Sequence, residues 1–124
     1  MEITRQPAVA GLFYPAEPTE LAAQVDALLD EAMPAAEYSR AIIAPHAGYV
    51  YSGPTAAHAY TALDPKTKRV LILGPTHRVG IEGMALTGAD LHRTPLGVVP
   101  SDIEITDALE ELPDVIVAPV VHAQ

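Results

Sequence analysis

The chain contains no cysteine among its 124 residues. Disulfide bonds and thiolate metal sites are therefore excluded for this segment, and a reducing compartment such as the cytoplasm is the simplest interpretation. Basic residues are scarce as well: seven Lys and Arg stand against 16 Asp and Glu, which gives a net charge of −9. No nucleic-acid partner is expected, because binding to phosphate backbones needs a basic surface.

Long hydrophobic runs are also missing. Although 49% of the residues are hydrophobic, every apolar stretch is much shorter than the roughly 20 residues that a membrane-spanning helix needs. The first residues, Met1–Arg5, lack the basic and apolar regions of a signal peptide. The composition is that of an ordinary globular domain, so we expect a cytoplasmic protein without a membrane partner.

Twelve prolines and eight glycines separate the apolar segments, as turn residues do. The spacing of apolar residues predicts helices over 18–32, 54–63 and 103–112, the last preceded by an S-x-x-E capping box that starts at Ser101. Continuous apolar runs predict buried strands over 40–44, 69–73 and 115–118, and residues 83–87 are a further candidate strand before a turn at 94–97. This alternation favours an α/β fold with a mostly parallel central sheet flanked by helices.

Three of the five histidines follow predicted strands closely, each after a proline. These are His46, His77 and His122. Ligands of an open parallel sheet gather at the carboxyl ends of its strands, and imidazole binds iron, copper and zinc. We therefore expect a shared metal site at this edge of the sheet, with His46 and His77, which lie in tight loops rich in proline and glycine, as the first candidate ligands and His122 as a candidate acid or base. The alternative is that each is a hydrogen-bonded surface residue.

The other two histidines are interpreted differently. His58 lies inside a predicted helix and is expected either to be structural or to contact a metal ligand without binding the metal itself. His92 stands beside Arg93 and just before a turn, so we expect it to be exposed.

The loops that carry His46 and His77 supply candidate pocket residues. Tyr51 is expected to present its hydroxyl to the site as a catalytic group, the alternative being that it packs in the core. An aromatic segment near the start, residues 8–15, is expected to pack against the domain or else to form a wall of the site. The remaining pocket residues are small, polar or basic: Gly48, Tyr49, Ser52, Thr76 and Arg78.

Four segments together carry a resemblance to a known family. They are PAVAGLFYP at 7–15, APHAGYVYSGP at 44–54, LGPTHR at 73–78 and TPLG at 94–97. In this order they resemble the Memo-like proteins, also called AmmeMemoRadiSam system protein B. The resemblance implies a LigB-like fold related to the class III extradiol dioxygenases, whose non-haem iron is bound by two histidines and a carboxylate.

The resemblance also implies how the site is divided along the chain. His46 and His77 match the two histidine motifs, whereas a further ligand comes from the C-terminal half of the family's longer chain. Residues 1–124 are therefore expected to be the N-terminal half of a single domain, ending before a Glu-His-Ser motif. A functional link to a radical-SAM protein is a further implication.

Three functions are consistent with these observations. The first is a metal-dependent oxidoreductase, with iron the expected metal and copper or zinc as alternatives. The second is a non-enzymatic module that binds a metal, a peptide or a small molecule in the same pocket. The third is a hydrolase in which zinc activates water, although the chain offers no dedicated general base for it.

Overall fold

The structure is a computed structural model and describes residues 1–123. The chain divides into two compact units. Val9–Val70 form one, called the helical unit below, and Met1–Ala8 together with the residues from Leu71 onward form the other, called the strand unit. Each unit is described by itself.

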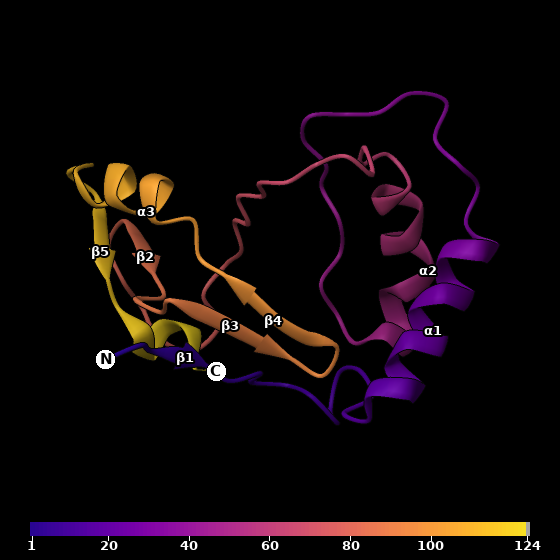
Figure 1. Ribbon diagram of the computed structural model, residues 1–124, viewed down its shortest axis with the longest axis horizontal. Coiled ribbons are helices and arrows are strands. Elements are labelled where there is room, and N and C mark those ends of the chain that lie inside the picture. Colours follow the sequence, from indigo (N-terminus) through magenta and orange to yellow (C-terminus); the bar gives the residue numbers. More distant parts are fainter. Residues whose placement is uncertain (124) are drawn as a thin grey trace. The chain divides into compact units, whose positions relative to one another are not determined.

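The helical unit consists of two helices and the loops around them (Figure 1). Helix α1, Pro18–Glu31, begins where the sequence predicts, because Pro18 fixes the first turn and the Glu17 carboxylate accepts a hydrogen bond from the Glu20 amide at 2.8 Å. Hydrogen bonds from the backbone amides of Glu20 and then Thr19 hold the pKa of Glu17 below its usual value. Helix α2, Tyr49–Tyr60, begins earlier than predicted and carries Pro54 inside it.

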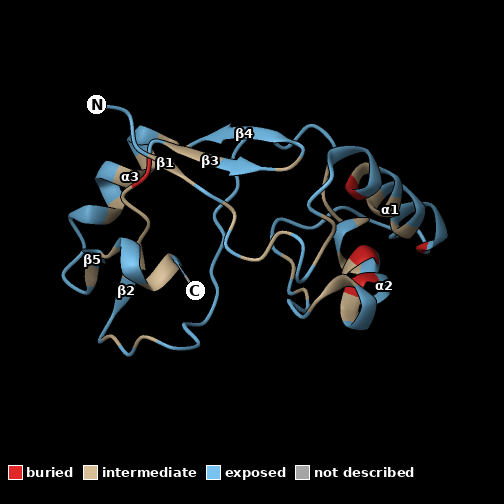
Figure 2. Ribbon diagram, turned by 90° about the horizontal axis from the view of Figure 1, so that it is seen from below, coloured by how far each residue is buried: buried red, intermediate tan, exposed pale blue. Residues whose placement is uncertain are grey.

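The two helices pack against each other through small residues. A side chain at Gly53 would meet Leu28 at 3.0 Å, so glycine permits the close approach of α2 to α1. The buried residues of these two helices are Leu21 in α1 and Gly53 and Ala57 in α2 (Figure 2).

The strand unit holds two small sheets. The first has the order β1-β3-β4, from Thr4–Arg5, Leu91–Thr94 and Gly97–Pro100, and the second pairs β2, Met84–Leu86, with β5, Val115–Val117. β1 pairs with β3 and β2 with β5 in parallel, whereas β3 and β4 form an antiparallel hairpin around the predicted turn. Helix α3, Ile103–Glu110, contacts β5, and the 3-10 helix η1, Pro119–His122, contacts β2.

The α/β class is therefore confirmed, and so are the strands predicted near 83–87 and 115–118. Two predicted strands are wrong: residues 40–44 and 69–73 join no ladder within residues 1–123. Strand formation needs a neighbour to accept and donate backbone hydrogen bonds, and an apolar run alone does not supply one.

Helix α3 begins at Ile103 as predicted, but its N-cap differs from the prediction. Asp102, not Ser101, is the N-cap, since its carboxylate accepts from the Ile105 amide at 3.2 Å. The Ser101 hydroxyl instead donates to the Ala89 carbonyl. The helix then ends at Glu110 rather than Leu112.

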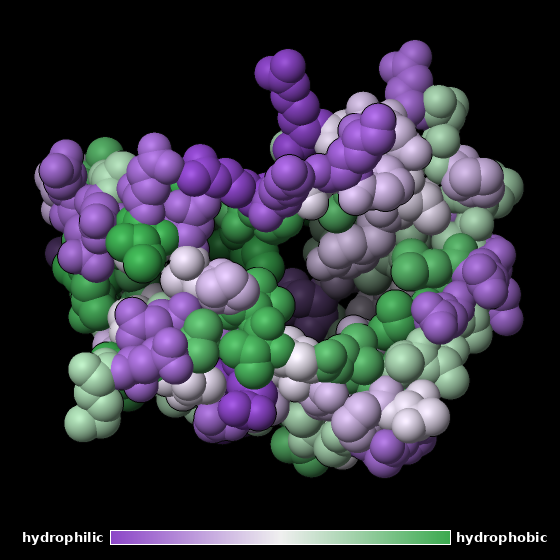
Figure 3. Space-filling model, viewed as in Figure 1, coloured by the Kyte–Doolittle hydropathy of each residue, from purple (hydrophilic) through white to green (hydrophobic). Residues whose placement is uncertain are grey.

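Much apolar surface is exposed in both units. Ile43 is 99% exposed and Ile72 is 84% exposed, both in the segments predicted to be strands. Apolar side chains reach the surface across the face drawn in Figure 3. Within residues 1–123 no helix is long and apolar enough to cross a membrane.

Candidate functional site

The loop that carries His46 leads directly into α2. His46 is exposed, and Gly48 is the N-cap of the helix. Gly48 lies against the N-terminal aromatic segment, because the next amide, that of Tyr49, donates to the Phe13 carbonyl at 2.8 Å. The Ser52 hydroxyl donates to the Ala47 carbonyl at 2.9 Å and so ties the first turn of α2 to the loop.

The two tyrosines of this loop have opposite environments. Tyr49 is half-buried against Tyr14, with ring centroids 5.6 Å apart and planes tilted by 41°. Burial, followed by the nearby Tyr14 and Tyr60, raises the pKa of the Tyr49 phenol. Tyr51 is 86% exposed, so the alternative that it packs in the core is wrong and its hydroxyl is accessible.

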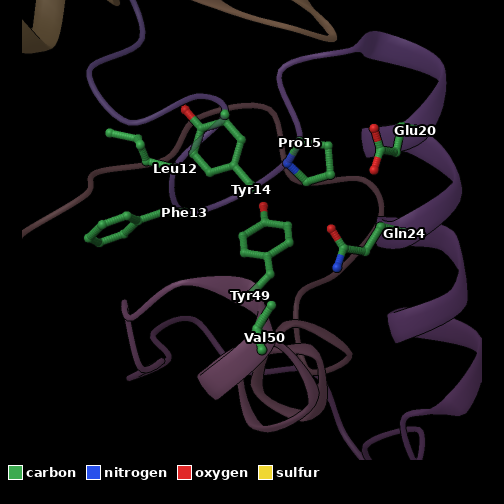
Figure 4. A pocket seen from close by; sticks show the side chains of 9 residues that line it. Leu12, Phe13, Tyr14, Pro15, Glu20, Gln24, Tyr49 and Val50 are labelled. Carbon is green, nitrogen blue, oxygen red and sulfur yellow. The ribbon is translucent and has the colours of Figure 1, made fainter.

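An open pocket of about 450 Å³ lies beside Tyr49. Figure 4 shows Tyr14 and Tyr49 between Leu12 and Phe13 on one side and two polar side chains of α1 on the other. Phe13 is 46% exposed, so the aromatic segment forms a wall of a pocket rather than part of a core. The full lining is Gly11, Leu12, Phe13, Tyr14, Pro15, Glu20, Gln24, Tyr49 and Val50.

The second predicted loop lies in the strand unit. His77 and Arg78 are both exposed. The Thr76 hydroxyl donates to the Val79 carbonyl, which closes the loop on itself. The imidazole and the guanidinium are therefore accessible to a ligand from solvent.

His122 lies in η1 and is held by two contacts. Its Nε2 lies 2.9 Å from the Ala85 carbonyl, and because a carbonyl only accepts, this nitrogen carries the proton. The Arg5 guanidinium donates to the backbone carbonyl of His122 from Nε at 3.2 Å and Nη2 at 2.8 Å. Nδ1 is consequently the ring atom of neutral His122 that can accept a proton.

The interpretation of His92 as exposed is wrong. His92 is half-buried, with Nε2 3.1 Å from the Thr87 hydroxyl and Nδ1 3.4 Å from the Ser101 hydroxyl. Since Ser101 gives its proton to the Ala89 carbonyl, Nδ1 of His92 donates and Nε2 accepts. Burial, and then the neighbouring Arg5 and His122, lower the pKa of His92 and so favour the neutral ring.

His58 behaves as expected for a structural residue. It is exposed on α2, and its Nδ1 donates to the Pro54 carbonyl at 2.7 Å, one turn earlier in the same helix.

The predicted site residues divide between the two units. His46 belongs to the helical unit and His77 to the strand unit, so their pairing at one metal stays a prediction. Within residues 1–123 no three His, Asp or Glu side chains form a cluster that could hold a metal ion. Two accessible imidazoles are suitable donors for a mid-series divalent metal, but a complete ligand set needs a further group. Of the other predicted residues, Gly48, Tyr49, Tyr51 and Ser52 lie in the helical unit, and Thr76, Arg78 and His122 in the strand unit.

Sequence reasoning missed two features that the fold creates. Arg5 lies 117 positions from His122 in the chain, and no local sequence pattern predicts their contact. Gln24 reads as an ordinary polar position on α1, yet its side-chain carbonyl oxygen is buried. The spacing of Glu20 and Gln24 on one face of α1, opposite an aromatic loop, was the available signal.

Comparison with known proteins gives one consistent family. The family model described as Memo-like protein matches residues 5–123. Protein MEMO1 of Xenopus laevis is 48% identical over 95 residues, which are 76% of this chain and 32% of the frog protein. Protein MEMO1 of Homo sapiens is 45% identical over the same share of each chain.

A more distant animal relative matches a longer segment. Protein memo-1 homolog of Caenorhabditis elegans is 42% identical over 109 residues, which are 87% of this chain and 31% of the nematode protein. The chain thus spans about a third of the length of the curated relatives that it matches.

Proposed function

Because the chain belongs to the Memo-like protein family, we propose that it contributes two imidazole ligands, His46 and His77, to a divalent metal site. The observation that carries this proposal is that both histidines are exposed in short loops rather than absorbed into a core. Imidazole donors suit iron, copper and zinc alike, and iron is proposed first because of the resemblance to the non-haem iron dioxygenases. A further ligand is proposed to come from a segment of the full-length protein that corresponds to the part of the relatives outside the matched residues.

The proposed activity is that of a metal-dependent oxidoreductase similar to the non-haem iron extradiol dioxygenases. A bound iron would supply redox chemistry at coordination positions left open by the protein. The chain's own groups would handle substrate and protons: the exposed hydroxyl of Tyr51 as a contact to substrate, and Nδ1 of His122 as a proton acceptor. Gly48, Ser52, Thr76 and Arg78 are proposed to shape the pocket, with Arg78 able to hold an anionic group.

A second candidate is a non-enzymatic binding module in the cytoplasm. The observation in its favour is the aromatic pocket beside Tyr49, which offers a binding surface independent of any metal. Its ligand would be a peptide or a small molecule. A functional link to a radical-SAM protein suits either candidate.

Metal content of the full-length protein, purified without oxygen, tests the proposal, because the further ligand is proposed to lie outside residues 1–124. We expect stoichiometric metal in the wild type and its loss in both His46→Ala and His77→Ala. His58→Ala is the matched control, because the His58 ring donates to the Pro54 carbonyl of its own helix and the substitution should leave the metal content unchanged.

Two results would contradict the proposal: a metal-free wild type, or a metal content that neither ligand variant changes. Oxygen uptake with a catechol then separates the two candidates. A metal-loaded protein that consumes no oxygen favours the binding module.

A further inference from the structure

The pocket beside Tyr49 contains a hydrogen-bond acceptor that nothing satisfies. Oε1 of Gln24 is buried and has no hydrogen-bond partner within residues 1–123. Buried polar atoms in folded proteins are nearly always paired, since leaving one unpaired is unfavourable. Gln24 lines the pocket, but Oε1 itself has almost no accessible surface, so the side-chain amide must turn toward the pocket before a ligand there that carries an N–H group can complete its hydrogen bonding.

The charge of the lining residues decides whether the pocket favours a cation or an anion. Glu20 lies one turn before Gln24 on the same face of α1 and also lines the pocket. No Lys, Arg or His is among the lining residues of this pocket within the part of the chain that the structure describes. An anion would therefore face an uncompensated carboxylate, whereas a cation would be attracted, the more so in a chain of net charge −9.

The aromatic walls favour the same kind of ligand. Tyr14, Tyr49 and Phe13 surround the opening, and the first two are in ring contact at 5.6 Å (Figure 4). Cations bind over aromatic faces, and the planar guanidinium group both stacks on a ring and donates several hydrogen bonds at its edge. A pocket of about 450 Å³ has the size of ordinary small-molecule sites.

From this arrangement we propose that the pocket lined by residues 11–15, Glu20, Gln24 and Tyr49 binds a small organic cation with N–H donors, best an alkylguanidinium. The cation stacks on the tyrosine rings, donates to Oε1 of Gln24 and is neutralised by Glu20. A quaternary ammonium ion has the charge but no N–H group, so it leaves Gln24 unpaired and binds more weakly.

Isothermal titration calorimetry of the full chain with butylguanidinium chloride tests this proposal. We expect saturable binding to the wild type and a loss of about tenfold or more in affinity for both Glu20→Gln and Gln24→Leu, since each removes a partner of a charged donor. Glu31→Gln is the matched control: it removes the same charge from the same helix, outside the pocket, and should leave the affinity unchanged.

Absence of saturable binding to the wild type would overturn the proposal, as would affinity that neither pocket variant changes. Tetramethylammonium binding as tightly as butylguanidinium would also overturn it, because the hydrogen bond to Gln24 would then have no role. Glu20 is exposed, so Glu20→Gln is decisive even where Gln24→Leu perturbs folding. His46→Ala should keep the affinity for butylguanidinium, which separates this proposal from the metal site.

Discussion

Replacing Gly83 by alanine should destabilise the strand unit, because two independent penalties meet at this residue. Gly83 has φ of +84°, a conformation that costs a side-chain-bearing residue about 1 kcal/mol. An added Cβ would also overlap the Asp114 carbonyl oxygen and lie 3.0 Å from its carbon. That oxygen accepts from the Met84 amide at 2.8 Å, and displacing it costs about 1 kcal/mol more.

The expected loss for Gly83→Ala is therefore about 2 kcal/mol in the free energy of unfolding. Urea unfolding of the full chain measures it, with Gly80→Ala as control. A Cβ at Gly80 meets nothing within 4 Å, so this control should stay within about 0.5 kcal/mol of the wild type.

Equal stability of Gly83→Ala and the wild type would refute the pairing of β2 with β5 described above. The candidate site would be affected as well, because β2 carries the Ala85 carbonyl that accepts a hydrogen bond from Nε2 of His122.

Two further predictions concern the polar contacts of the strand unit. Arg5→Met removes both hydrogen bonds to the His122 carbonyl and should cost about 2 kcal/mol in urea unfolding; an unchanged midpoint would mean that this contact contributes nothing to stability. The pKa of His92 is depressed from its usual 6.5 by burial and then by Arg5 and His122, so the unfolded chain takes up the proton first as pH falls. The stability that neutral His92 contributes is thus present above pH 6.5 and is lost as the pH falls below that value. Urea unfolding at pH 7.5 and pH 5.5 should show a smaller pH dependence of stability for His92→Gln than for the wild type. An identical pH dependence in both proteins would contradict the assignment.

Local patterns predicted the elements whose stability is local. The sequence predicts the start of α1 at residue 18 and the turn at 94–97, although not the strands β3 and β4 that this turn joins. The family followed from four short motifs in order, which the match over residues 5–123 confirms. In each case the determining interactions lie within a few residues of one another in the chain.

Strands depend on partners that a local pattern does not contain. Residues 40–44 and 69–73 each contain an apolar run of four residues and 115–117 one of three, yet only 115–117 pairs with a neighbouring strand within residues 1–123. The same limit applies to polar residues. His92 looked exposed beside Arg93, but the strands around it place hydroxyls on both ring nitrogens.

The sequence by itself determined the family, the α/β class, the acidic and cysteine-free character, and which histidines are candidates for a metal. Only the tertiary structure decided which polar atoms have hydrogen-bond partners. Nε2 of His122 pairs with the Ala85 carbonyl, and the two ring nitrogens of His92 pair with hydroxyls. Oε1 of Gln24 has no partner within the residues that the structure describes. The reason is physical. Composition and motifs act through the chemistry of single residues, whereas hydrogen bonding and burial depend on groups that lie far apart in the chain and meet only in the fold.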